Sequence, residues 1–189
     1  MSPIELTDLI DEIYLSNKAK IKISEKLKSD ELKFWNKITS NKKILNIELS
    51  NDTTGENNSF TYFQNLSQQV ENVKFLDLFY IQKSYLGNFV TFYLKSRIYR
   101  ECGNDKMIYP DTIVCDPLGN FNKYFDENWK FLNSHYSELI YIPFNWLERI
   151  PKNAKKYKIK KDSNIYELLF GYEGNIMKNK IIGNKRFRK

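Results

Sequence analysis

The sequence predicts an α+β domain with a largely antiparallel sheet and helices packed on it. Two β-rich runs, residues 73–82 and 89–98, are joined by a short connector and predict a central hairpin at about 73–98. Helical periodicity occurs on both sides of this hairpin, which favours an α+β arrangement. The chain has no internal repeat and no Pro/Gly-rich linker. We therefore expect a single α+β domain over 1–177 and a basic, flexible C-terminal tail over 178–189.

The composition is that of a chain able to form a packed core. Of the 189 residues, 41% are hydrophobic and 15% aromatic, which excludes a disordered chain. No apolar run approaches the ~20 residues needed to cross a bilayer. The N-terminus carries acids where a signal peptide needs positive charge, and the two cysteines are too few for a disulfide framework. These features predict a cytoplasmic protein.

The first 70 residues are predicted to hold three helices, a short strand and a polar loop. Ser2-Pro3-Ile4-Glu5 has the form of a capping box and precedes apolar residues at helical spacing. A second helix is expected over 29–38, a short strand over 44–49 and a polar loop over 50–59. The spacing of apolar side chains predicts a third helix over 60–70, with these residues on one side: Phe63, Leu66 and Val70.

The central hairpin shows the clearest alternation in the chain. In each run the apolar side chains recur at every second position, so they share one face of the sheet. The face is predicted to hold Val73, Phe75, Phe79 and Ile81 from the first run, and Val90, Phe92, Leu94 and Ile98 from the second. Gly87 or Asn88 is expected to supply a positive φ in the turn.

The rest of the chain alternates between short elements. Strands are expected over 112–116 and 138–142, a short helix over 144–150, and a lysine-rich edge strand over 155–160. Ser163 is expected to cap a helix over 165–170. A longer amphipathic helix is expected over 121–132, and its aromatic residues favour a core role over a ligand groove: Phe121, Tyr124, Phe125 and Trp129.

The positive charge is concentrated at the C-terminal end. The formal net charge is +7, yet residues 149–189 hold 13 Lys or Arg against 3 Asp or Glu, so the preceding residues are slightly acidic. One interpretation is a nucleic-acid-binding accessory protein that tracks phosphates with Lys155, Lys156, Lys158, Lys160 and Lys161, with Tyr157 among them. The five arginines are few for base readout or bidentate phosphate contacts, which favours a solvated lysine-rich surface.

The residues that could perform catalysis form no recognisable motif. His135 is the single histidine, and its place near the end of a predicted helix favours a dipole partner over a catalytic base. Cys102, Cys115 and His135 are too few and too widely spaced for a zinc site, and no phosphate-binding glycine loop occurs. We therefore expect no metal, no cofactor and no catalytic residues. The alternative is a metal-dependent nuclease or toxin that uses four carboxylates with Lys130: Asp111, Asp116, Asp126 and Glu127.

Two segments carry a resemblance to a known class of proteins. Residues 84–93, Ser-Tyr-Leu-Gly-Asn-Phe-Val-Thr-Phe-Tyr, and 165–170, Ile-Tyr-Glu-Leu-Leu-Phe, lie in a domain that resembles some bacterial immunity proteins of polymorphic-toxin or type VI secretion pairs. The resemblance implies a role in bacterial competition: tight binding to a cognate toxin or effector domain, without enzymatic activity. For a cationic toxin, the acids expected at the contact surface are Glu101, Asp105, Asp111, Asp126 and Glu127.

Overall fold

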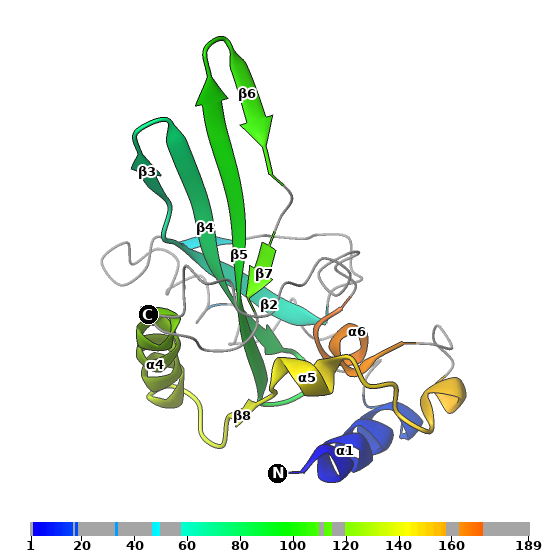
Figure 1. Cartoon of the computed structure of the whole chain (residues 1–189). Coiled ribbons are helices and arrows are strands. Elements are labelled where there is room, and N and C mark those ends of the chain that lie inside the picture. Colours follow the sequence, from blue (N-terminus) through cyan, green and yellow to red (C-terminus); the bar gives the residue numbers. More distant parts are fainter. Residues whose placement is uncertain are drawn as a thin grey trace.

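The structure is a computed structural model, and it confirms the α+β class with a mostly antiparallel sheet (Figure 1). It describes residues 2–16, 18, 33, 47–49, 58–109, 112–114, 120–157 and 163–171. Its helices are α1 (Pro3–Leu15), α4 (Asn120–Asn133), α5 (Phe144–Leu147), a 3₁₀ helix (Ala154–Lys156) and α6 (Ile165–Phe170). Its strands are β1 (Ile47–Leu49), β2 (Ser59–Asn65), β3 (Gln68–Val70), β4 (Val73–Ser84), β5 (Phe89–Cys102), β6 (Asp105–Ile108), β7 (Thr112–Val114) and β8 (Ile140–Tyr141).

The two long strands β4 and β5 form the centre of the sheet. The main strand order is β1-β2-β4-β5-β6, with β3 also paired to β4, and with β7 and β8 paired to β5. Among the described strands, β8 alone runs parallel to its neighbour. The predicted hairpin is therefore confirmed, and it is longer than the sequence pattern indicated. Of the helices in the described ranges, none has the length and apolar character that crossing a membrane requires.

The turn between β4 and β5 differs from the prediction, because neither Gly87 nor Asn88 has a positive φ. Glycine is needed at this position for space: a Cβ atom at Gly87 would lie 2.8 Å from Cε2 of the Phe89 ring. That ring is buried in the core. The glycine therefore allows the turn to pass close to an aromatic side chain.

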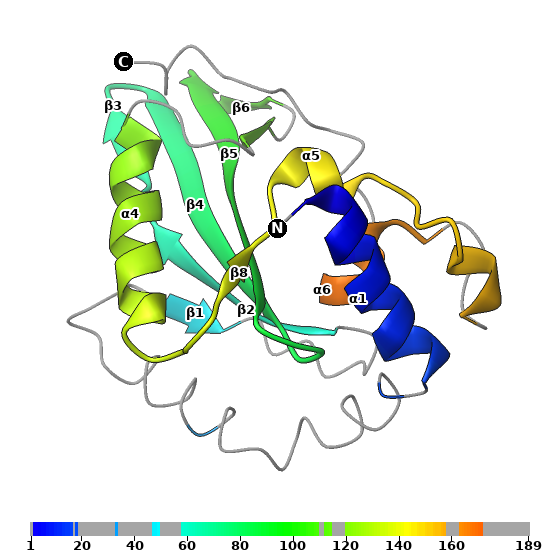
Figure 2. The same ribbon diagram turned by 90° about the horizontal axis from the view of Figure 1, so that it is seen from below.

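Helices cover both faces of the sheet, and each face has its own hydrophobic cluster (Figure 2). On one face, α4 packs on the predicted apolar face of the hairpin, where the Phe92 ring lies 5.8 Å from Phe79 and 5.0 Å from Phe125 between ring centroids. Tyr124 and Trp129 also pack there, which confirms their predicted core role; the side chain of Phe121 lies outside the described ones. On the other face, α1, α5 and α6 cover the stacked pair Tyr80 and Tyr93.

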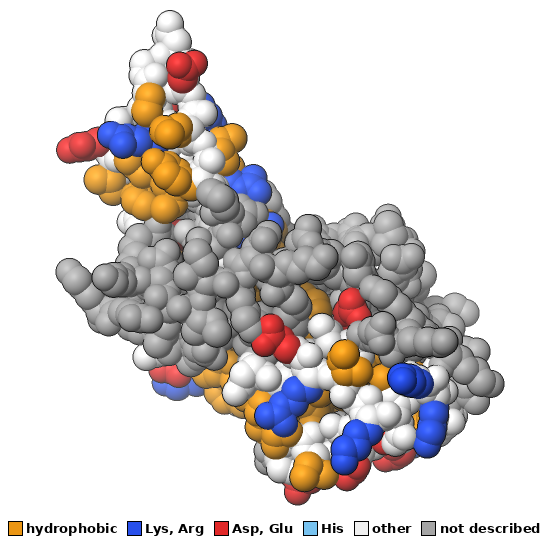
Figure 3. Space-filling model, turned by 45° about the vertical axis from the view of Figure 1, so that its right-hand side comes forward, with side chains coloured by type: hydrophobic (Ala, Val, Ile, Leu, Met, Phe, Trp, Pro, Cys, Tyr) orange, Lys and Arg blue, Asp and Glu red, His pale blue; other side chains and the backbone are white. Residues whose placement is uncertain are grey.

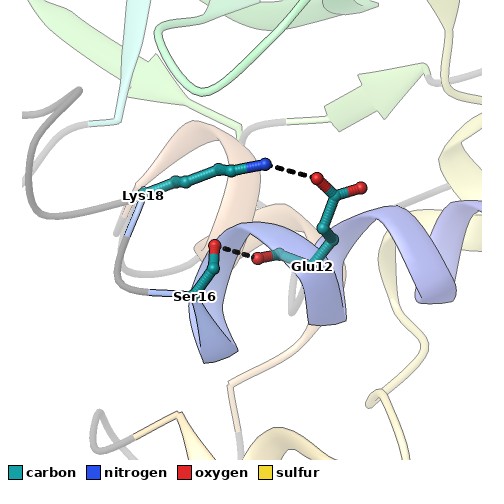
Figure 4. Close-up of polar contacts among 3 residues, drawn as sticks. All are labelled: Glu12, Ser16 and Lys18. Carbon is teal, nitrogen blue, oxygen red and sulfur yellow. Dashed lines mark hydrogen bonds and ion pairs between the residues drawn. The ribbon is translucent and has the colours of Figure 1, made fainter.

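Helix α1 begins as predicted, with both halves of the capping box formed by Ser2 and Glu5. Hydrogen bonds from the Ser2 backbone and side chain lower the pKa of the Glu5 carboxyl. At the other end, Ser16 donates its hydroxyl to the Glu12 carbonyl, and Lys18 pairs with the Glu12 carboxylate (Figure 4). Both charged side chains are more than half exposed, so the ion pair adds little to stability.

The last carbonyl groups of α6 receive hydrogen bonds from side chains of other elements. Ser84 donates to the Leu169 carbonyl (2.5 Å) and Ser59 to the Phe170 carbonyl (2.7 Å). Backbone groups at a helix end need such partners when they are buried. These bonds fasten the short helix α6 to β2 and β4.

The start of α6 corrects a predicted cap. The N-cap is Asn164, whose side chain accepts a hydrogen bond from the Glu167 N–H, whereas Ser163 precedes the cap and is buried. The two residues are adjacent and both are good caps, so the sequence pattern alone did not separate them.

The predicted helix over 60–70 is wrong, because the segment forms β2 and β3 and pairs with β4 in one continuous register. The run Phe60-Thr61-Tyr62-Phe63 is rich in residues that favour strands, and β4 offers it a long partner. The predicted edge strand over 155–160 is wrong over the part that is described. Residues 154–156 form a 3₁₀ helix, and Tyr157 is buried with its hydroxyl bonded to the Asp11 carboxylate.

The other predicted elements vary in how far they are described. The predicted strand over 44–49 is described for β1 only, and β7, β8, α4 and α5 fall within or close to the expected ranges. Of the helix predicted over 29–38, the structure describes Lys33 alone, as helical. Most of the loop predicted over 50–59 and the predicted tail over 178–189 lie outside the described residues.

Candidate protein-binding surface

One end of the sheet projects beyond the described helices as an arm, which we define as residues 67–76 and 97–109 (Figure 1). It consists of β3, the first part of β4, the last part of β5, and β6. At its base, the buried carboxylate of Asp77 accepts a hydrogen bond from the Ser96 hydroxyl (2.6 Å). This pair lies on the same face as the α4 cluster, at the last positions before the face becomes exposed.

The face of the arm that continues the α4-covered face is apolar. The pairing register places six apolar side chains on it: Val70, Val73, Phe75, Ile98, Met107 and Tyr109. Three of them are strongly exposed: Val70 by 55%, Met107 by 53% and Tyr109 by 41%. Hydrophobic side chains also gather on the projecting end in the space-filling view (Figure 3). Clustered exposed apolar side chains of this kind mark interaction sites more often than isolated ones do.

The opposite face of the arm carries both aromatic and charged side chains. Tyr99 lies at its centre, with the Lys106 ammonium 4.5 Å from its ring centroid and the Arg97 guanidinium donating to its hydroxyl at 3.4 Å. Glu101 stands directly opposite Lys106 across the β5–β6 pair. The charges on this face are therefore largely arranged as neighbours of opposite sign or as cation–π contacts.

The acids predicted to contact a partner do not form one surface. Glu101 and Asp105 both lie near the tip of the arm and are exposed, but the register places them on opposite faces. Asp126 and Glu127 are exposed residues of α4, and this helix lies at the end of the sheet away from the arm tip (Figure 1). Glu127 is 3.9 Å from Lys123 one turn earlier. Asp111 lies outside the described residues.

The predicted nucleic-acid contacts are described only in part. Lys155 and Lys156 are exposed in the 3₁₀ helix, whereas Lys158, Lys160 and Lys161 lie outside the described residues. Tyr157 is only 5% exposed, so its ring is not available to stack on a base. Instead, the ring stacks on Tyr14, with 5.1 Å between centroids.

The candidate catalytic residues are not brought together within the described part of the chain. Asp111, Asp116 and Cys115 lie outside it, and no three His, Cys, Asp or Glu side chains of the described residues are grouped as metal ligands would be. His135 follows α4 and is exposed, with Nδ1 2.9 Å from the Phe131 carbonyl oxygen, which fits its expected place at a helix end. Cys102 is exposed beside Gly103, whose φ is +63°.

The apolar face of the arm was not predicted from the sequence. A local signal was present: the run Met107-Ile108-Tyr109 follows the Gly103-Asn104 turn after two residues, as a returning strand does. The periodicity of the sequence does not show that none of the described helices covers this strand. The exposure depends on how far β4 and β5 extend past α4, which is a property of the packed domain.

In the part of the chain that the structure describes, the fold and this surface define an α+β domain whose sheet extends beyond the helices as an arm with one apolar face. No protein-family model, curated protein or solved structure shows a significant match to the chain.

Proposed function

We propose that this chain is a non-enzymatic binding protein of the immunity type, which acts in the cytoplasm and neutralises a cognate bacterial toxin by direct contact. The observation that carries the proposal is the apolar face of the arm. It combines exposed aliphatic and aromatic side chains from β3 and from the β6 segment, which pair with the two long strands β4 and β5, and such a site is suited to a protein partner.

The arrangement on this face matches the anatomy of a protein interface. Protein interfaces have an apolar centre with aromatic anchors, and a polar rim. Here Phe75 and Tyr109 are the aromatic side chains, and Arg100 and Asp105 lie on the same face at the tip side. The apolar side chains would supply most of the affinity, and the rim charges would set orientation and specificity.

The acids near the tip favour a partner with a basic contact surface. Asp105 borders the apolar face, and Glu101 is one residue from the β5–β6 turn on the other side. Exposed charges at an interface rim mainly accelerate association and are screened by salt. A toxin that acts on nucleic acid carries positive charge around its own site, so Asp105 and Glu101 could approach that site.

The proposal is tested by co-expressing the chain with the product of the adjacent gene in a bacterial host. The expected result is that the wild-type chain co-purifies with that product and restores growth. The double variant Met107→Ser, Tyr109→Ser is expected to lose both effects, because it removes two exposed apolar side chains from the arm.

A matched control replaces exposed apolar side chains elsewhere. Ile4 on α1 and Ile150 after α5 are exposed by 74% and 55%, so Ile4→Ser and Ile150→Ser should leave binding unchanged. No complex and no growth rescue with the wild-type chain would overturn the proposed function. A complex that survives the arm variant would show that another surface binds the toxin.

A further inference from the structure

We infer that a partner of the arm carries an acidic side chain within an apolar contact surface, and that Arg100 pairs with this acid and selects for it. The inference rests on the proposed function, because it takes the apolar face of the arm to be the site of protein contact. It adds the chemistry that a partner must present to this site.

Arg100 lies within the apolar face of the arm. The pairing register places it between Val73 of β4 and Met107 of β6, in a row that ends with Val70 of β3. Side chains that stand directly opposite each other in a sheet have Cβ atoms about 4.5–5.5 Å apart. Ile98 shares the face two positions earlier on the same strand. The stem of the arginine side chain is therefore flanked by apolar groups.

The charge of Arg100 is not matched within the arm. Arg100 is exposed, and among the described residues its guanidinium takes part in no ion pair, hydrogen bond or cation–π contact. Arg97 and Lys106 differ from it, because both contact Tyr99 on the opposite face. Asp105 shares the face of Arg100 as a diagonal neighbour, with Cα atoms about 7–8 Å apart, and no ion pair joins these two described residues.

Binding at this face would change the surroundings of the guanidinium. An apolar partner surface that covers Val73 and Met107 also removes water from Arg100 between them. A charged group that loses its water without gaining a partner is costly, whereas one that meets a carboxylate contributes to specificity. A guanidinium suits a carboxylate, since it can donate two parallel hydrogen bonds to it. The partner surface that fits the arm therefore has an Asp or Glu side chain opposite Arg100.

Asp105 adds a direction to this pattern. It pairs with Cys102, so it lies closer to the arm tip than the row of Arg100 does. A basic side chain of the partner would face it, in agreement with the basic contact surface proposed above. The partner would then present an acid and a base about 7–8 Å apart, with the base nearer the tip. A surface with these two charges exchanged would oppose like charges and bind less well.

The inference is tested without a toxin by selecting short random peptides displayed on phage against the purified full chain. The double variant Met107→Ser, Tyr109→Ser serves to remove peptides that bind elsewhere. The remaining peptides are expected to combine apolar residues with Asp or Glu more often than the starting library does. The same selection on Arg100→Gln should lose this enrichment of acids, and Arg100→Glu should enrich Lys or Arg instead.

A selected peptide then measures the coupling between the two charges. Replacing its acid by the corresponding amide is expected to weaken binding to the wild-type chain about tenfold. The same replacement should change binding to Arg100→Gln little, because the ion pair is already broken. Lys74→Gln is the matched control, since Lys74 is an exposed cation that pairs with Tyr99 on the opposite face of the arm. It should bind the peptide as the wild-type chain does.

The inference is overturned if the arm-dependent peptides carry no excess of acids, if the excess is the same on Arg100→Gln, or if no peptide depends on the arm. These results leave the proposed toxin binding standing, since the co-expression test asks whether a complex forms and not which charge it uses. Failure of the co-expression test would reject the toxin, while the peptide selection would still decide the chemistry of the surface.

Discussion

The hydroxyl of Tyr14 donates a hydrogen bond to the carbonyl oxygen of Leu168 at 2.6 Å, and so ties the first helix of the chain to α6. The side-chain N–H of Asn58 donates to the same carbonyl oxygen at 2.9 Å. Three segments from distant parts of the sequence therefore meet at the end of α6. Because helix-end carbonyls need partners when buried, this contact helps to hold one face of the domain together.

Replacing Tyr14 by Phe should lower the free energy of unfolding by about 1 kcal/mol. The loss stays near this value because Asn58 continues to donate to the Leu168 carbonyl. Urea denaturation measures it. The double variant Tyr14→Phe, Asn58→Ala should cost more than the two single changes together, since it leaves a buried carbonyl without these donors. If the loss in the double variant equals the sum of the two single losses, the two hydrogen bonds contribute independently.

The domain should lose stability at alkaline pH through Tyr14 and Tyr157. Burial raises the pKa of both hydroxyls well above the ordinary value of 10.0, and the Asp11 carboxylate raises that of Tyr157 further. A group whose pKa is higher in the folded state contributes its stability below the unfolded pKa and loses it as pH rises above that value. Above about pH 10, each residue should lower the free energy of unfolding by about 1.4 kcal/mol per pH unit.

Urea denaturation between pH 8 and pH 11 checks this expectation. Tyr14→Phe and Tyr157→Phe should each flatten the decline relative to the wild-type chain, because each removes one titrating group. Tyr99→Phe is a suitable comparison, since Tyr99 lies on the partly exposed arm. If the free energy of unfolding falls with pH equally steeply in the wild type and in Tyr14→Phe, the role assigned to the Tyr14 hydroxyl is contradicted.

Gly87→Ala and Gly103→Ala should both destabilise the domain, for different reasons. At Gly87 the added methyl group would meet the buried Phe89 ring, so the ring or the turn must move. At Gly103 no atom lies within 4 Å of the added methyl group, and the cost is the positive φ of +63°, about 1 kcal/mol. Adding Phe89→Leu should reduce the cost of Gly87→Ala and leave that of Gly103→Ala unchanged in thermal unfolding measurements.

Neutralising the acids on the arm and those on α4 should have different effects on partner association, although both groups were predicted as contacts. If the arm tip is the contact surface, Glu101→Gln with Asp105→Asn should slow association with the proposed toxin partner and weaken the dependence of the association rate on salt. Asp126→Asn with Glu127→Gln, on α4, should leave the association rate unchanged. Stopped-flow measurements at two ionic strengths distinguish these outcomes. The opposite result would place the contact surface on α4.

The capping box of Ser2 and Glu5 and the apolar alternation of β4 and β5 could be predicted from the sequence because both patterns are local. A cap needs residues three apart, and a strand face needs every second residue. The segment over 60–70 could not be assigned in this way. Its apolar spacing fits a helix, yet pairing with β4 supplies more hydrogen bonds and packing than an isolated helix would have.

The candidate binding surface, too, could be predicted from the sequence only in part. The sequence by itself determined that acids stand near Glu101 and Asp105 and that apolar residues follow the Gly103-Asn104 turn. Only the tertiary structure decided that these two acids lie on opposite faces, and that the face with Met107 and Tyr109 is left uncovered by α4. The physical reason is that side-chain direction follows from the local period of a strand, whereas burial depends on which distant element packs above it.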